Sequence, residues 1–237
     1  MELEKFKIET KKICEQNKIM LLEEQIEQFY KYMKLLIEWN QKINLTAIVE
    51  PREIIQKHFI DSLSILKYIK EGQSLIDVGT GAGFPGIPIK IATSNVHVTL
   101  LDSLQKRVNF LNNVIEELKL TKIEAIHSRA EEYTKQQRES YDIAVSRAVA
   151  NMSTLTEYLL PYIKINGIAI CMKGPNVDEE LEKSKKAIKI LGGKVEKVEH
   201  FFVNEDMERN LIIIRKINST PKQYPRKAGK PSKEPIS

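Results

Sequence analysis

The pattern of apolar and polar positions along the chain changes near residue 75. Before that point, apolar side chains recur every three or four residues, which is the spacing of a helix with one buried face. The pattern predicts three helices, over residues 3–15, 20–40 and 51–70. Pro51 suits the first turn of the last helix, because no intrahelical partner awaits a backbone N–H there. We expect residues 1–70 to form a helical cap on a larger core.

From residue 75 onward, short apolar runs alternate with longer amphipathic segments. The runs predict strands over residues 75–78, 97–102, 123–127, 141–146, 167–172, 195–203 and 209–216. Helices are expected over residues 86–93, 104–119, 153–164 and 178–191. Alternation of this kind is typical of a parallel sheet covered on both faces by helices. The last two strands are joined by residues 204–208, which are too few for a parallel crossover. The predicted fold class is α/β, with a mostly parallel, seven-stranded, Rossmann-like sheet whose last strand is antiparallel.

The first predicted strand runs into a glycine-rich loop, and together they read S-L-I-D-V-G-T-G-A-G-F-P-G over residues 74–86. Glycine lets a ligand approach the backbone closely. A phosphate-binding P-loop needs Lys and Ser or Thr where Ile87 and Pro88 stand. A dinucleotide fingerprint needs glycine where Phe84 stands, and Pro85 removes an N–H that a pyrophosphate would use. What remains is D-x-G-x-G-x-G, which resembles the first motif of class I S-adenosylmethionine-dependent methyltransferases.

Polar residues follow the next three predicted strands. Asp102 ends the second strand, where a carboxylate can bind the hydroxyls of an adenosine ribose. Glu131, after the third strand, lies where this fold contacts adenine, but it is equally an ordinary acidic residue at a helix N-terminus. Arg147 closes the fourth strand and points either into the ligand crevice or into a structural ion pair. His58 and Asp61 share a helix face, and we interpret them as a structural pair rather than a catalytic dyad.

The composition is that of a globular protein, with 42% apolar and 29% charged residues in a chain of 237, which predicts one main domain. No apolar run is long enough to cross a bilayer, and the first residues lack the apolar core of a secretory signal. We therefore expect a cytoplasmic protein without membrane contact. Cys14 and Cys171 lie far apart and lack the spacing of a zinc site, which predicts two reduced thiols and no metal.

The net charge of +5 is concentrated near the end of the chain. Five basic residues face only one acidic residue, Glu234, in this segment; they are Lys222, Arg226, Lys227, Lys230 and Lys233. Prolines at 221, 225, 231 and 235 argue against a helix or a central strand. The tail is therefore either a solvated, mobile terminus or an arm that contacts nucleic-acid phosphates.

The residues that common methyl-transfer reactions use are missing from the sequence. No Asn/Asp-Pro-Pro-aromatic motif is present for methylation of an amino group. Cys171 lies in an apolar strand, where thiols are usually inert, so a cysteine nucleophile for pyrimidine carbon 5 is disfavoured. Nitrogen 7 of guanine already carries a free lone pair and needs no general base. Catalysis would then consist of alignment in a site that excludes water.

Taken together, the motifs resemble those of the bacterial 16S rRNA (guanine-N(7))-methyltransferase family, called RsmG or glucose-inhibited division protein B. The resemblance runs nearly from end to end and rests on W-N-Q-K-I-N-L-T from Trp39, H-x-x-D-S from His58, D-V-G-T-G-A-G-F-P-G from Asp77, L-L-D-S-L-x-K-R from Leu100, R-A-E from Arg129, S-R-A from Ser146, K-G from Lys173 and Y-P-R-K-A-G-x-P-S-K-x-P-I from Tyr224. The last of these favours a functional tail over a mere terminus.

The resemblance implies methyl transfer from S-adenosyl-L-methionine to a guanine in the 530 loop of 16S rRNA, either free or in the 30S subunit. It implies cofactor contacts by Gly79, Phe84, Ala130, Glu131 and Arg147, to which the fold argument adds Asp102. From charge and placement we predict RNA contacts by Lys173, Arg226, Lys227 and Lys230. The implied organisation is a cap over 1–70, a methyltransferase domain over 71–217 and a basic tail over 218–237.

The sequence alone leaves the catalytic residue, the protein partner and two other function classes open. No single catalytic residue and no obligate protein partner is indicated. A protein that binds S-adenosylmethionine or RNA without catalysis would carry the same loop. A methyltransferase acting on a small molecule would carry it as well.

Overall fold

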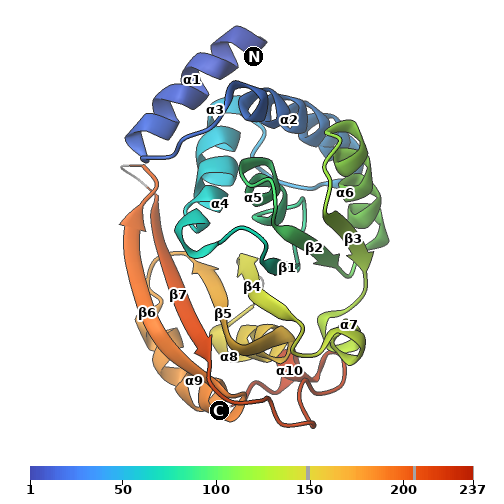
Figure 1. Cartoon of the computed structure of the whole chain (residues 1–237), viewed down its shortest axis with the longest axis vertical. Coiled ribbons are helices and arrows are strands. Elements are labelled where there is room, and N and C mark those ends of the chain that lie inside the picture. Colours follow the sequence, from blue (N-terminus) through green and yellow to red (C-terminus); the bar gives the residue numbers. More distant parts are fainter. Residues whose placement is uncertain (148–149, 205–206, 237) are drawn as a thin grey trace.

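The protein was analysed as a computed structural model, which describes residues 1–147, 150–204 and 207–236. Seven strands form one sheet in the order β3-β2-β1-β4-β5-β7-β6 (Figure 1). The strands are β1 Ser74–Val78, β2 His97–Asp102, β3 Ile123–His127, β4 Tyr141–Arg147, β5 Ile163–Lys173, β6 Gly193–Phe202 and β7 Glu208–Lys216. The pairs from β3 to β5 are parallel, and β7 is antiparallel to both of its neighbours. The predicted sheet, including its reversed last strand, is confirmed.

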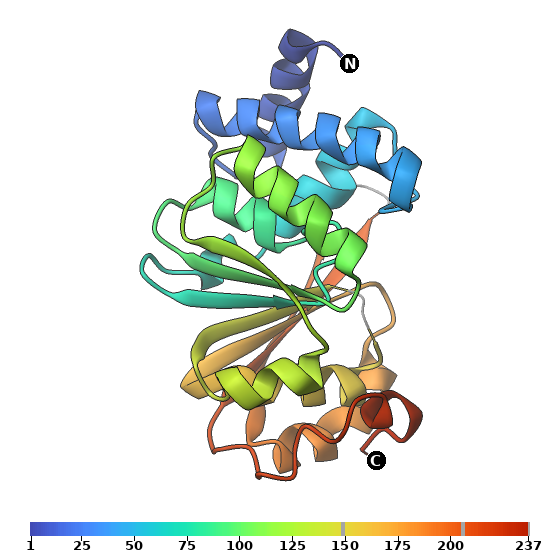
Figure 2. The same ribbon diagram turned by 90° about the vertical axis from the view of Figure 1, so that its right-hand side faces the viewer.

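Helices cover both faces of the sheet, and the two ends of the chain lie on opposite sides of it (Figure 2). One face carries α1 Leu3–Gln16, α2 Glu23–Ile43, α3 Pro51–Ile54, α4 Asp61–Leu63, α5 Gly86–Ala92 and α6 Gln105–Glu117. The other carries α7 Ala130–Gln137, α8 Met152–Leu159, α9 Asp178–Ile190 and α10 Lys230–Lys233. Successive strand residues point to opposite faces, so Leu75 joins the first core and Ile76 the second.

The N-terminal helices pack directly on the glycine-rich loop. Tyr32 of α2 is fully buried, and its hydroxyl donates a hydrogen bond to the carbonyl of Ala82. Its ring lies 5.5 Å from the rings of Phe59 and Phe84, measured between centroids. The helices and the loop therefore share one apolar core, which fixes the position of the loop.

Several boundaries differ from those predicted. The segment expected as one helix begins at Pro51 as predicted, but it passes through a π-helical stretch, Ile55–Ile60, and ends in a short 3-10 turn, Leu66–Tyr68. Strand β5 begins at Ile163, so residues 163–164, predicted as helix, are strand. Helix α7 was not predicted, because its sequence is mostly polar and has little apolar periodicity.

The tail contains a helix, α10, which the prolines had argued against. Pro231 lies in the first turn of α10, where a missing N–H costs no intrahelical bond. The predicted hairpin connector includes Glu205 and Asp206, and the S-R-A segment includes Ala148 and continues to Val149. These four residues lie outside the described part of the chain, as does Ser237. Over the described ranges, no helix has the length and apolar character of a membrane span.

Candidate functional site

The loop after β1 has the backbone of a ligand loop. Gly79, Gly81 and Gly83 have φ angles of 71°, 62° and 98°, a region that side chains rarely adopt. A Cβ added to Gly83 would lie 2.7 Å from the Tyr32 hydroxyl, so this glycine faces the core. A Cβ added to Gly81 would meet no atom within 4 Å. Gly81 therefore presents bare backbone to open space.

Asp77 ties the two ends of this loop together. Its side chain is fully buried, and its Oδ2 accepts hydrogen bonds from Thr80 Oγ1 at 2.6 Å and from the Gly86 N–H at 2.8 Å. Burial raises the pKa of Asp77 to about 6, and these two hydrogen bonds oppose the rise. The Asp77 carboxylate thus stabilises the conformation of the loop through hydrogen bonds and is not exposed to a ligand.

Asp102, at the end of β2, holds the same loop from the side. Its Oδ2 accepts a hydrogen bond from the Gly81 N–H at 2.9 Å, and its Oδ1 accepts one from the Leu104 N–H at 2.9 Å. Parallel pairing of β1 with β2 brings the two strand ends together, as the sequence argument required. Arg107 Nη1 also donates to Oδ2, at 3.4 Å. A carboxylate can accept about four hydrogen bonds, so capacity remains for about one more from a ligand hydroxyl.

A cavity of about 240 Å³ opens at this edge of the sheet. Four residues predicted to bind the cofactor line it: Gly79, Asp102, Ala130 and Glu131. Its remaining walls are mixed, with the apolar side chains of Val78 and Leu101 and, from α8 and α10, Tyr158 and Ser232. The two carboxylates can accept hydrogen bonds from hydroxyl or amino groups of a ligand, and a cation, Arg129, lines the cavity beside them. These acceptors fit a nucleoside such as the adenosine part of S-adenosylmethionine, whose hydroxyl and amino groups donate.

Phe84 and Arg147 lie outside this cavity, in a second cluster. Arg147 Nη1 donates to Asp61 Oδ2 at 3.0 Å, and its Nη2 lies 3.3 Å from His58 Nδ1. The Phe84 ring stacks on the His58 ring with centroids 4.4 Å apart, and the Arg147 guanidinium lies 4.9 Å from the Phe84 centroid. The ion pair that was one alternative for Arg147 is therefore present. Contact of Phe84 and Arg147 with the cofactor stays a prediction.

The second cluster surrounds a buried carboxylate and a neutral imidazole. Asp61 is 1% exposed, and Arg209 Nε, from β7, donates to its other oxygen at 3.0 Å. Burial and the Arg147 charge lower the pKa of His58 to about 3, so its imidazole is neutral. His58 Nε2 lies 2.9 Å from Thr46 Oγ1. The sequence reasoning missed Arg209, because nothing in its local pattern distinguishes it from a surface arginine.

Two of the four residues predicted to bind RNA are engaged with carboxylates of the protein. Lys173 Nζ donates to Glu180 Oε1 at 2.8 Å and is 13% exposed. Arg226 Nη2 donates to Glu157 Oε2 at 2.6 Å. Both charges are therefore balanced within the fold, and contact of Lys173 and Arg226 with RNA stays a prediction. Lys227 and Lys230 are exposed.

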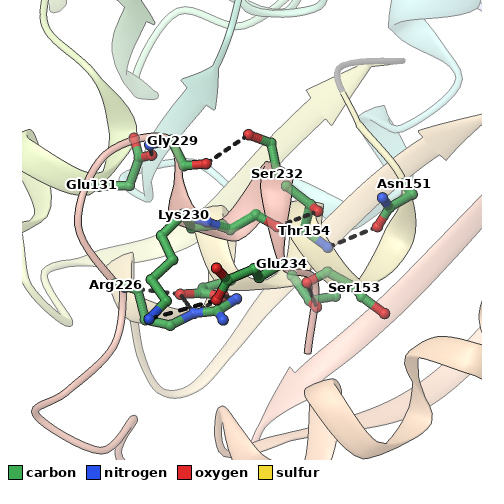
Figure 3. A network of polar contacts seen from close by, with 12 residues as sticks. Glu131, Asn151, Ser153, Thr154, Arg226, Gly229, Lys230, Ser232 and Glu234 are labelled. Atoms are coloured by element: carbon green, nitrogen blue, oxygen red, sulfur yellow. Dashed lines mark hydrogen bonds and ion pairs between the residues drawn. The ribbon is translucent and has the colours of Figure 1, made fainter. Parts of the chain in front are cut away.

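The tail as a whole is docked on the domain rather than free in solvent. The Gly229 N–H donates to Glu131 Oε1 at 3.0 Å, and Arg226 lies against the same surface (Figure 3). This corrects the alternative of a solvated, mobile terminus. The basic arm is anchored, and its exposed lysines lie on a segment that also reaches the cavity.

Comparisons with known proteins identify the family of this chain. The family model described as rRNA small subunit methyltransferase G matches residues 25–212. The Ribosomal RNA small subunit methyltransferase G of Clostridium botulinum (strain Eklund 17B / Type B) is 56% identical over 221 residues, covering 91% of this chain and 92% of the relative. The protein of the same name from Alkaliphilus oremlandii is 52% identical over 225 residues, covering 92% and 93%.

Solved structures match the fold at low sequence identity. A SAM dependent methyltransferase from Aquifex aeolicus is 19% identical with a TM-score of 0.51, covering 69% of this chain and 93% of that one. M. jannaschii TYW2 in complex with AdoMet is 13% identical with a TM-score of 0.55, covering 67% and 76%. These likenesses concern the fold.

Proposed function

The chain belongs to the rRNA small subunit methyltransferase G family, and on this premise we propose that it methylates nitrogen 7 of a guanine in the 530 loop of 16S rRNA. The methyl donor is S-adenosyl-L-methionine, whose sulfonium group supplies the methyl. The observation that carries the proposal is the cavity in which the carboxylates of Asp102 and Glu131 meet the exposed backbone of the glycine-rich loop.

Within this proposal, each residue of the cavity has a role that its chemistry supports. Asp102 would accept hydrogen bonds from the ribose hydroxyls, and Glu131 would accept from donors nearer the base. Gly79 and Ala130 would let the ligand approach the backbone, because neither carries a large side chain. The apolar wall of Val78 and Leu101 excludes water from one side of the ligand.

The protonation states in the neighbouring cluster suit a reaction without a general base. His58 is neutral but buried and already hydrogen bonded, and the charge of Asp61 is balanced by Arg147 and Arg209. Neither side chain is available to accept a proton from a substrate. Nitrogen 7 of guanine has no proton to give up, so the protein needs only to align the two reactants and exclude water.

The RNA would contact the exposed lysines of the tail. Lys227 and Lys230 are solvent-exposed, and the only carboxylate within 4.0 Å of Lys230 Nζ in the described residues is that of Glu234, at 3.6 Å. Exposed cations of this kind bind phosphates by releasing counterions. Free 16S rRNA and the 30S subunit are the two candidate substrates, and either one implies a reaction in the cytoplasm.

The decisive experiment is methyl transfer from labelled S-adenosylmethionine to 16S rRNA and to 30S particles from a strain that lacks this gene. Cleavage at methylated guanines would map the site. One labelled guanine in the 530 loop is the expected result, and the better of the two acceptors identifies the substrate. Binding of the cofactor without labelled rRNA would favour a small-molecule methyltransferase or a binding protein instead.

A further inference from the structure

The C-terminal tail follows a defined course over the face that carries α7 and α8 (Figure 2). Arg138, directly after α7, donates hydrogen bonds to the carbonyls of Thr220 and Tyr224 at 2.5 and 2.7 Å. Farther along, Thr154 Oγ1 of α8 donates to the carbonyl of Pro231 at 2.9 Å, in a buried contact. The tail is thus held on both sides of residues 226–230.

Between these points, a buried ion pair fixes the tail to α8. The Glu157 side chain is fully buried. Its Oε1 accepts from the Arg226 N–H at 2.8 Å and from Nε at 2.9 Å, and its Oε2 accepts from Nη2 at 2.6 Å. A buried carboxylate that lost this partner would be left as an uncompensated charge. The pair therefore places Arg226 at one defined position on the domain.

Three residues beyond Arg226, the tail contacts Glu131 (Figure 3). The Gly229 N–H donates to Oε1 of Glu131, a carboxylate that lines the cavity. Gly229 has a φ of 81°, which glycine adopts readily, and it begins the turn of α10. Ser232, in α10, lines the same cavity beside Tyr158. Chain segments far apart in sequence thus complete one binding site.

We propose that residues 226–232 form a wall of the cofactor cavity, and that Arg226 and Glu157 are positioning residues that hold this wall in place. The inference rests on the proposed function, because S-adenosylmethionine is the ligand. Gly229 engages one oxygen of Glu131 and so orients the carboxylate toward the ligand. Ser232 covers the cavity from the side of α10. Loss of the ion pair would free the stretch that leads to Gly229, although Thr154 would still bind the Pro231 carbonyl.

The two possible roles of the tail, as a wall of the cavity or as a segment that only attracts RNA, predict different effects of removing a basic residue. In a tail that only attracts RNA, each cation contributes about equally and none affects cofactor binding in the absence of RNA. In a wall, Arg226 is required for cofactor binding by the protein alone. Lys222 provides the matched comparison, because it is exposed and removal of either side chain takes one positive charge from the same segment.

The first test measures binding of S-adenosylhomocysteine to the full chain by isothermal titration calorimetry, without RNA. Arg226→Ala should weaken binding at least about tenfold, and Lys222→Ala should leave it within about twofold, where tenfold corresponds to about 1.4 kcal/mol. Equal affinities for wild type and Arg226→Ala would overturn the proposal. Circular dichroism and thermal unfolding establish that the variants compared are folded.

A second pair of variants covers the case in which Arg226→Ala does not fold. Ser232→Phe places a large ring at the cavity wall, whereas Lys233→Phe places the same ring at the next residue, which does not line the cavity. Both positions are exposed, so both variants should fold. We expect Ser232→Phe alone to lose binding of S-adenosylhomocysteine. If neither variant or both variants lost binding of S-adenosylhomocysteine, the proposed wall would be contradicted.

The two proposals fail in different ways. If wild type binds S-adenosylhomocysteine but methylates no rRNA, the substrate assignment is wrong and the wall can still be tested. If wild type binds and methylates rRNA while the wall variants bind equally well, only the wall is wrong. Hydrogen exchange adds an independent readout, because the Gly229 amide should exchange more slowly when the ligand is bound.

Discussion

Arg147 at the end of β4 and Asp61 in α4 form a partly buried ion pair, with 3.0 Å between Nη1 and Oδ2, across 86 positions of sequence. Arg209 completes the arrangement from β7, so one carboxylate joins the N-terminal helices to two strands. The Asp61 side chain is 1% exposed, and each of its two oxygens is paired with a guanidinium group. The ion pair holds the N-terminal helices against the edge of the sheet where the glycine-rich loop lies.

Replacement of Asp61 should therefore destabilise the protein strongly. Asp61→Asn leaves two partly buried guanidinium groups without their counter-charge, and we expect a loss of about 3 kcal/mol in the free energy of unfolding. Glu179→Gln, which breaks an exposed pair with Lys183, should cost less than about 1 kcal/mol. Urea unfolding of both variants gives the comparison. Similar losses in the two would show that the Asp61 cluster contributes no more than a surface pair.

His58 should contribute a loss of stability in mild acid, which Asp77 opposes because its raised pKa of about 6 lets the folded state bind a proton there. Burial and Arg147 lower the pKa of His58 in the folded state to about 3, below the usual value of about 6.5. Between these values the unfolded chain binds a proton at His58 that the folded chain does not, so the His58 contribution to stability is full above about pH 6.5 and decreases as the pH falls toward 3. The slope from His58 reaches about 1.4 kcal/mol per pH unit.

His58→Gln should remove this part of the pH dependence. Chemical unfolding at about pH 7 and about pH 5 measures the slope in wild type and in the variant. His200→Gln, which removes an exposed imidazole on β6, serves as the matched variant. If the slope changed with His200 and not with His58, the proton would be bound elsewhere.

Gly81→Val should abolish cofactor binding while circular dichroism stays close to that of wild type. The added side chain would enter the open space beside Asp102, and a β-branched residue at a φ of 62° is strained by about 1 to 2 kcal/mol. Gly72→Val is the matched control, because Gly72 also has positive φ and open space, but lies before β1. Calorimetry with S-adenosylhomocysteine should separate the two. Equal loss of binding in both would point to strain alone.

Both cysteines should resist thiol reagents in the folded protein. Burial raises the pKa of Cys14 to about 11 and that of Cys171 to about 12, so neither forms the reactive thiolate near neutral pH. A colorimetric thiol reagent should react with neither residue until denaturant is added. Cys171→Ala should retain rRNA methylation. Loss of methylation in a folded Cys171→Ala protein would revive a cysteine nucleophile and contradict direct transfer to nitrogen 7.

The sequence by itself determined the order and type of most elements. The period of a strand or a helix is visible in the order of apolar and polar residues along the chain, because apolar residues face the core. The seven strands could therefore be predicted from local patterns. The position of Asp102 beside the glycine-rich loop could be predicted as well. In this fold, the ends of the first two strands lie next to each other. Helix α7 escaped prediction, because its sequence is mostly polar and carries little apolar periodicity.

Only the tertiary structure decided how the charged residues are used. Arg226 and Glu157 are 69 positions apart, and Gly229 and Glu131 are 98 apart, so no local pattern records either contact. In the sequence, Arg226 is one of five basic tail residues; in the fold, a buried carboxylate on α8 fixes its position. The same holds for Arg147, which ends a strand where a ligand contact was predicted and is held there by Asp61. Charged residues pair according to which surfaces meet when the chain folds. Burial of the whole hydrophobic core determines which surfaces meet.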